Sequence, residues 1–191
     1  MSRFQWKVLR VSGAILVSIL LFLLLRVNNY PYKASVVLPD VHPNEVWEFV
    51  ADFSNMKYLN PTIEDFKIID EKGNYNHWQY TVQYKESLSH WPYLPNYAEA
   101  KFSIKANSQK DRFFINSLHV TCLLSNFLCL SSESEFIFTH MNKSAGTVCE
   151  ENIHYQCPSI FSKFCKREVR YQRDAIMKNL KNKFQSGPIS R

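Results

Sequence analysis

The chain has 191 residues, a formal net charge of +6 and a hydrophobic content of 46%. Four residues are glycine and 15% are aromatic, a composition that excludes a disordered or low-complexity chain. About 160 residues remain outside the apolar N-terminal segment, which is enough for one domain with a sizeable core and too few for two.

The N-terminal segment is apolar, and no charged residue occurs from Val11 to Leu25. A bilayer span needs about twenty residues, so flanking apolar residues have to contribute. We expect one membrane helix from about Val8 to Val27, with Leu16 and Leu21 inside it. A cleaved signal peptide would have the same basic start and apolar centre. The small residues that cleavage requires do not follow the apolar run, and we therefore favour an uncleaved anchor.

The charges beside this segment predict its orientation. Arg3, Lys7, Arg10 and the amino terminus outweigh Arg26 and Lys33 on the other flank. The positive-inside rule then places the N-terminus in the cytosol and the rest of the chain in a lumen or outside the cell.

Three parts follow from this organisation. Residues 1–29 are expected to form a cytosolic tail and a signal-anchor helix, residues 30–185 one folded domain, and residues 186–191 a short tail. Asn142 opens an Asn-Lys-Ser sequon on an expected hairpin tip, so it is the predicted glycosylation site of a lumenal domain.

The five cysteines allow two short disulfides in a lumenal domain. Cys122 and Cys129 bracket a short loop, and Cys157 and Cys165 bracket a strand-to-helix turn, so both pairs could close and leave Cys149 alone. Five buried free thiols are the alternative, which the sequence leaves open.

The first part of the domain follows the order strand, helix, short helix, strand. Alternation over residues 34–38 predicts a strand, and Pro43 suits the first position of a helix, where its missing N–H is not needed. That helix is expected to end near Asp52. A second, short helix is stopped before Pro61, and residues 66–69 predict the next strand.

The remainder predicts five more strands and one long helix. Residues 77–84 alternate most clearly between an aromatic face and a polar face. The other expected strands cover residues 98–106, 112–122, 133–140 and 147–156.

A helix is expected over residues 159–184, where apolar residues recur every three or four positions and Gln172 interrupts the stripe. Eight cations lie between Lys163 and Lys183, against two acidic residues. We interpret this run as a solvated face with no nucleic-acid partner, and contact with anionic lipid is the alternative.

The motif Pro43-x-x-Val46-Trp47-x-x-Val50-x-Asp52-Phe53, followed by Asn60-Pro61, resembles the opening of the START-like superfamily. Its members include steroidogenic-acute-regulatory lipid-transfer domains, pollen allergens, polyketide cyclases and coenzyme-Q-binding proteins. The resemblance implies an α+β helix-grip fold, in which a curved antiparallel sheet of about seven strands wraps a long C-terminal helix. It also implies a ligand cavity between sheet and helix.

No catalytic or metal motif stands out, because the six histidines are dispersed and no Cys-x-x-Cys or phosphate-binding glycine loop occurs. We expect no cofactor and no metal. Apolar residues with a few polar ones are typical of lipid or sterol sites. The residues expected to line such a cavity are Trp78, Tyr80, Phe102, Phe114, Asn116, Phe136, Phe138, His140, Tyr155, Gln172, Ile176 and Leu180. The same residues would also make an ordinary filled core.

The resulting hypothesis is a single-pass membrane-anchored domain that binds or transfers a lipid, sterol or isoprenoid without covalent chemistry. One alternative is a cyclase-like enzyme that uses His140, Glu151 or Asn116. Another is a non-catalytic interaction protein with a filled core. Two apolar loops, at residues 89–97 and 122–130, would either touch the bilayer or cap the core.

Overall fold

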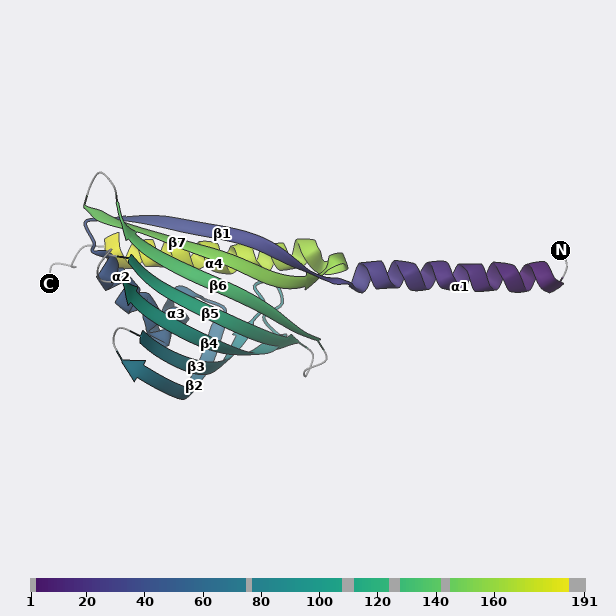
Figure 1. Cartoon of the computed structure of the whole chain (residues 1–191), viewed down its shortest axis with the longest axis horizontal. Coiled ribbons are helices and arrows are strands. Elements are labelled where there is room, and N and C mark those ends of the chain that lie inside the picture. Colours follow the sequence, from purple (N-terminus) through teal and green to yellow (C-terminus); the bar gives the residue numbers. More distant parts are fainter. Residues whose placement is uncertain (1–2, 75–76, 108–111, 124–127, 142–144, 186–191) are drawn as a thin grey trace.

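The computed structural model describes residues 3–74, 77–107, 112–123, 128–141 and 145–185. Its N-terminal helix, α1 (Arg3–Leu25), projects from one end of a folded domain (Figure 1). The elements of the domain are β1 (Val27–Pro39), α2 (Pro43–Ala51), α3 (Phe53–Leu59), β2 (Ile63–Asn74), β3 (His77–Ser87), β4 (Pro95–Asn107), β5 (Arg112–Leu123), β6 (Leu128–His140), β7 (Gly146–Pro158), η2 (Ser159–Phe161) and α4 (Ser162–Gln185).

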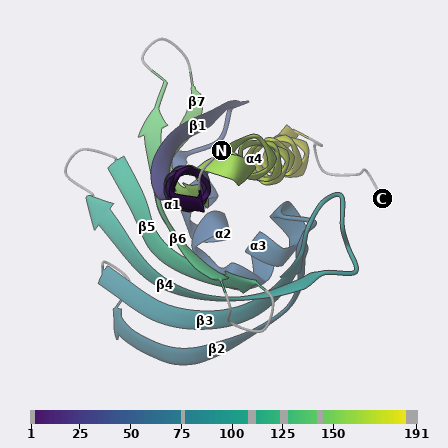
Figure 2. The same cartoon turned by 90° about the vertical axis from the view of Figure 1, so that its right-hand side faces the viewer.

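The strands form one antiparallel sheet in the order β1-β7-β6-β5-β4-β3-β2. The sheet curves around a space that holds α2, α3 and α4 (Figure 2). The first strand therefore pairs with the last one, and α4 crosses the concave face. This arrangement confirms the predicted α+β helix-grip fold, and the element order is the predicted one.

The first strand is longer than the sequence predicted, because β1 begins at Val27 instead of Ala34. Val27 pairs with Pro158 of β7, so the prediction that it belongs to the membrane helix is wrong. The apolar run continues through Val27, but backbone pairing with β7 determines its conformation. Only Arg26 separates α1 from β1.

Local capping places the two short helices as predicted. Pro43 is the first residue of α2, and the His42 side chain accepts a hydrogen bond from the Asn44 N–H at 3.2 Å. Asp52 ends α2 and caps α3, because its Oδ1 accepts from the Ser54 N–H at 2.9 Å. Each cap satisfies a backbone N–H that the helix leaves free.

The apolar faces of these helices close one end of the concave space. The Trp47 indole N–H of α2 donates to the Phe114 carbonyl of β5 at 3.2 Å. The buried Phe53 ring of α3 lies 5.6 Å from the Phe102 ring of β4. The Asn179 side chain of α4 donates to the Leu59 carbonyl at 2.9 Å and ties the long helix to α3. These contacts pack the three helices against the concave face of the sheet and form the core of the domain.

Candidate functional site

Most of the aromatic residues expected to line a cavity lie in this packed core. Tyr80 and Phe102 stack with ring centroids 4.8 Å apart, and the Tyr80 hydroxyl donates to the Ala51 carbonyl at 2.9 Å. The predicted residues that are buried in this core are Tyr80, Phe102, Phe136, Phe138, Ile176 and Leu180.

Three further predicted residues lie at its margins. Trp78 is half-buried and packs against the core, and its indole Nε1 is a buried atom for which no hydrogen-bond partner exists among the described residues. Tyr155 is buried in a separate small cluster beside the first turns of α4, where it stacks on Tyr30 at 5.7 Å. Gln172 is half-buried on α4 and faces the interior.

The structure corrects the prediction for two residues of β5. Phe113, Ile115 and Ser117 are buried, so Phe114 and Asn116 alternate to the outer, convex face of the sheet. The sequence was ambiguous here because two phenylalanines are adjacent and either could begin the inward register. A shift of one residue moves every side chain to the other face.

His140 is also outside the interior. It is the last residue of β6, it is exposed, and its ring lies 4.7 Å from the ring of His42. Its register on the strand is inward, as predicted, but it lies at the end of the strand beside the N-cap residue of α2.

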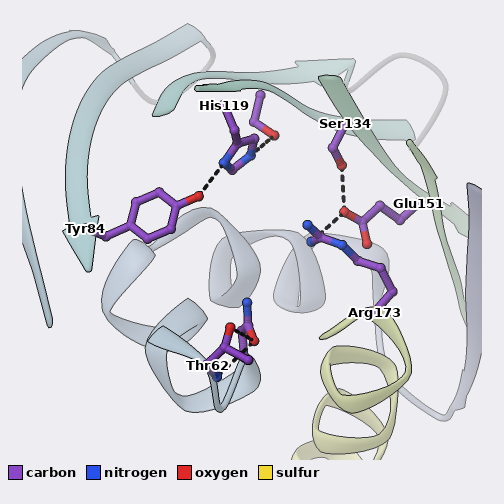
Figure 3. A network of polar contacts seen from close by, with 8 residues as sticks. Thr62, Tyr84, His119, Ser134, Glu151 and Arg173 are labelled. Atoms are coloured by element: carbon purple, nitrogen blue, oxygen red, sulfur yellow. Dashed lines mark hydrogen bonds and ion pairs between the residues drawn. The ribbon is translucent and has the colours of Figure 1, made fainter. Parts of the chain in front are cut away.

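The interior instead holds a group of buried polar side chains, which we call the interior polar cluster (Figure 3). Four strands and α4 contribute to it. Its members are Tyr84, Ser117, His119, Ser134, Glu151 and Arg173.

An ion pair forms one half of this cluster. The Arg173 guanidinium donates to Oε1 of Glu151 at 3.0 Å, and the Ser134 hydroxyl donates to the same oxygen at 2.6 Å. Glu151 is fully buried, and the Arg173 side chain is 14% exposed. Among the described residues, Glu151 Oε2 and Arg173 Nε are buried without a hydrogen-bond partner. The pair therefore keeps one free acceptor and one free donor.

A neutral histidine forms the other half. His119 Nδ1 lies 2.9 Å from the Tyr84 hydroxyl, and its Nε2 lies 2.8 Å from Ser117 Oγ. Burial, followed by the positive charge of Arg173, lowers the pKa of His119 to about 3. Burial raises the pKa of Tyr84 well above its usual value. Both rings are therefore uncharged at neutral pH and can only exchange hydrogen bonds.

Two carboxyl groups near Arg173 hold their protons more tightly than usual. Burial raises the pKa of Glu86 to about 7, Arg173 acts against this shift, and Glu168 adds to it. Burial also raises the pKa of Glu151, opposed by Arg173 and by the hydrogen bond from Ser134. Proton binding in this interior is therefore possible near neutral pH.

A small cavity adjoins the interior polar cluster, bordered by Phe53, Glu86, His119, Glu151 and Gln172 among others. Its volume is about 30 Å³. A cavity of this size holds one or two water molecules, whereas sites for drug-sized ligands have roughly 300–1,000 Å³. The described side chains thus leave little free volume beside the interior polar cluster.

Sequence reasoning named Glu151 as a candidate but missed the other polar members of this site. Glu86 could have been found, because it continues the inward register of Tyr80 and Tyr84 on β3. Arg173 was hidden in a run of cations, although its neighbour Gln172 marked the place where the apolar stripe is interrupted. Within the described residues, no group of three or more His, Cys, Asp or Glu side chains is placed to hold a metal ion.

Disulfide bonds join Cys122 to Cys129 and Cys157 to Cys165, and Cys149 is a buried free thiol. The second disulfide fixes the end of β7 to the start of α4. The sequon residue Asn142 lies outside the described residues.

The N-terminal helix is long and apolar enough to cross a membrane, over 21 residues from Gln5 to Leu25. Leu16 and Leu21 are exposed on it, and Val8 belongs to the same helix. A signal sequence would meet the same criterion of length and composition.

No protein-family model and no curated protein sequence matches the chain. Solved structures do match it. The lipid transfer and protein localization domain of human StarD13 superposes with a TM-score of 0.55 at 16% identity, covering 83% of this chain and 77% of that one. A START superfamily protein from Mycobacterium smegmatis gives a TM-score of 0.51 at 10% identity, over 82% of this chain and 96% of that one.

A third match is the di-domain ARO/CYC protein StfQ of the steffimycin biosynthetic pathway, with a TM-score of 0.53 and 14% identity. It covers 81% of this chain, which spans only 45% of StfQ. The chain has the START-like fold. At these sequence identities, similarity to the solved structures establishes only the fold of this chain. Its activity has to be argued from its residues.

Proposed function

We propose that this chain is a single-pass membrane-anchored START-like domain that binds or transfers a hydrophobic ligand with one polar group. The observation that carries the proposal is a pair of buried atoms, Glu151 Oε2 and Arg173 Nε, that have no hydrogen-bond partner among the described residues. Buried polar atoms without a partner are rare and costly, and they are usually satisfied by water or by a ligand. The apolar core around them suits the rest of a lipid, sterol or isoprenoid.

The chemistry of the two free atoms favours a hydroxyl group. The Nε–H of Arg173 would donate a hydrogen bond to the hydroxyl oxygen, and the hydroxyl group would donate one to Oε2 of Glu151. Such a group satisfies both protein atoms at once, whereas a carbonyl oxygen would satisfy only the donor. The neutral His119 and Tyr84 add no charge to the site, in keeping with an uncharged ligand.

Ligand binding requires the concave space to open, because its cavity holds only about 30 Å³. The connection between β3 and β4 is the segment that would move to open it. It is fastened to α4 by the Ser89 N–H and hydroxyl, each of which donates to the Glu168 carboxylate at 2.8 Å. Releasing these contacts would uncover the side of the space that Glu86 borders. Loop movements of this kind open and close the active sites of many enzymes.

The anchor and the domain boundaries belong to the same proposal. Residues 1–29 would hold the domain of residues 30–185 on the lumenal or outer side of a membrane. The two disulfides support this side, because disulfides persist in oxidising compartments.

The test is native mass spectrometry of the full chain, released from lipid nanodiscs. We expect one hydrophobic molecule to remain bound to the wild type and to Arg170→Met, whose arginine is exposed on the same helix. Arg173→Met should lose it, and Ser134→Ala should weaken its retention. Wild-type protein without a bound molecule, or equal retention in all variants, would contradict the proposal.

A filled-core interaction protein is the second candidate, and the small size of the cavity favours it. The cyclase-like alternative has less support. Of the three residues considered for it, Glu151 alone lies inside, while Asn116 faces outward and His140 is exposed at a strand end.

A further inference from the structure

Exposed apolar side chains gather at the end of the domain where α1 joins it. We call them the joint surface: Trp91, Tyr93, Leu94, Ile160 and Phe161, with exposed fractions of 46%, 77%, 41%, 51% and 49%. The first three belong to the connection between β3 and β4, and the last two to η2. Large apolar groups clustered on a surface usually mark a contact with a partner or a membrane.

Hydrogen bonds fix η2 to the end of α1. The Ser159 N–H donates to the Arg26 carbonyl at 3.0 Å, and the Ser159 hydroxyl donates to the same oxygen at 3.1 Å. The Asn28 side chain donates to Ser159 Oγ at 2.7 Å. Ile160 therefore directly follows Ser159, which is hydrogen-bonded to Arg26, the residue after α1. No flexible linker separates the helix from this surface.

The β3–β4 connection lies against the same end of the domain. The Trp91 ring stacks on Phe164, in the first turn of α4, with centroids 5.2 Å apart. Figure 2, which looks along α1, shows this connection and the start of α4 on the side that faces the viewer. The disulfide between Cys157 and Cys165 brackets η2, so the η2 part of the joint surface is held in place.

We infer that the joint surface is embedded in the interfacial layer of the bilayer that α1 crosses. The inference rests on the proposed membrane anchor. If Leu25 ends the span, Arg26 lies at headgroup level, because it is the next residue. The polar layer beyond the hydrocarbon is about 5–7 Å thick on each side. Because Ser159 is hydrogen-bonded to Arg26, η2 then lies in or beside that layer, and the joint surface contains tryptophan and tyrosine, the two residue types enriched there.

The charges beside the joint surface fit the same partner. Lys163, Lys166 and Arg167 are exposed on the first two turns of α4. The Arg167 guanidinium lies 5.4 Å above the Phe164 ring, beside Trp91. Cations that flank interfacial aromatic residues can reach the lipid phosphates. In this position, release of the β3–β4 connection from α4 would open the interior toward lipid. A ligand would then pass between bilayer and interior without crossing water.

The test measures membrane depth in the full chain, reconstituted in phosphatidylcholine nanodiscs. Single nitroxide labels are attached through p-acetylphenylalanine in the variants Tyr93→p-acetylphenylalanine and Ile160→p-acetylphenylalanine, which leave the disulfides intact. Tyr58, which is 59% exposed, is the matched control position, because it belongs to α3, an element far from α1 in Figure 1. Leu16 reports the anchor itself. The readout is the ratio of collisions with oxygen to collisions with a water-soluble nickel chelate.

We expect this ratio to be several-fold higher at positions 93 and 160 than at position 58, and highest at position 16. A high ratio at position 16 with aqueous values at 93 and 160 would overturn the joint-surface inference and leave the anchor standing. An aqueous value at position 16 would overturn the anchor, and the inference with it.

Discussion

Single residues decide the character of the interior, and Arg173 has the largest influence. It pairs with the fully buried Glu151, and its charge shifts the pKa values of Glu86, Glu151 and His119. A buried ion pair contributes little net stability compared with apolar side chains, but breaking one strands a buried charge. The pair therefore makes the interior polar at a position where the fold itself would accept leucine or methionine.

Replacing Arg173 tests this account. We expect Arg173→Met to lower the free energy of unfolding by about 3–5 kcal/mol, because Glu151 is left without its partner. The double variant Arg173→Met, Glu151→Leu should recover most of the loss. Arg170→Met, which removes an exposed arginine paired with Asp174, should change stability by less than about 1 kcal/mol. Chemical denaturation in detergent measures all three, and equal losses in the single and double variants would contradict the account.

Glu86 should make stability depend on pH. Its pKa of about 7 in the folded chain lies above the ordinary value of 4.5, so the folded state holds this proton more tightly than the unfolded state. The stabilisation from Glu86 is complete below pH 4.5 and is lost as pH rises toward 7. The loss amounts to about 3 kcal/mol.

Glu86→Gln should remove this pH dependence. His119 acts in the opposite sense, because its lowered pKa favours the folded state at higher pH. The comparison is therefore the difference between Glu86→Gln and wild type at each pH from 4.5 to 8. A constant difference over that range would show that the Glu86 pKa is unshifted.

At the scale of elements, the fold depends on how the first strand closes against the last one. Gly146 begins β7 opposite Pro39 and has a φ of +143°. A Cβ there would lie 2.6 Å from the Leu38 carbonyl oxygen. Any larger residue would have to move the backbone that joins β1 to β7.

Gly146→Ala should therefore lower the free energy of unfolding by about 2 kcal/mol. Gly13→Ala is the matched control, because nothing lies within 4 Å of a Cβ on that residue of α1. It should leave the unfolding of the domain unchanged in the same thermal denaturation experiment. An equal change in domain unfolding for both substitutions would mean that a side chain at position 146 does not strain the pairing of β1 with β7.

The sequence predicted most elements because their signals are local. Alternation marked β3 and β4, and proline and asparagine marked the ends of the short helices. The register of β5 was not predictable, because Phe113 and Phe114 suit the inner face equally well. The first half of β1 was missed for another reason: its polar and aromatic residues form a strand only because β7 lies beside them.

At the scale of the molecule, the proposed topology predicts a modification. Asn142 should be glycosylated in cells if the domain is lumenal, since glycans are added to Asn-x-Ser/Thr sequons on the lumenal side. Endoglycosidase treatment should then increase electrophoretic mobility in the wild type and have no effect on Asn142→Gln. A chain without glycan, whose C-terminus is cut by protease in intact microsomes, would reverse the topology.

The sequence alone determined the order of elements and the apolar helix at the N-terminus, because periodicity, prolines and an uncharged run act over short distances. The tertiary structure alone decided what the concave space contains. Tyr84, His119, Ser134, Glu151 and Arg173 come from five different elements and meet only when the sheet curves around α4. Their burial sets their charges, and the packing of the surrounding aromatic rings leaves about 30 Å³ beside them. Neither packing nor desolvation can be predicted from local sequence, since both depend on neighbours distant in the chain.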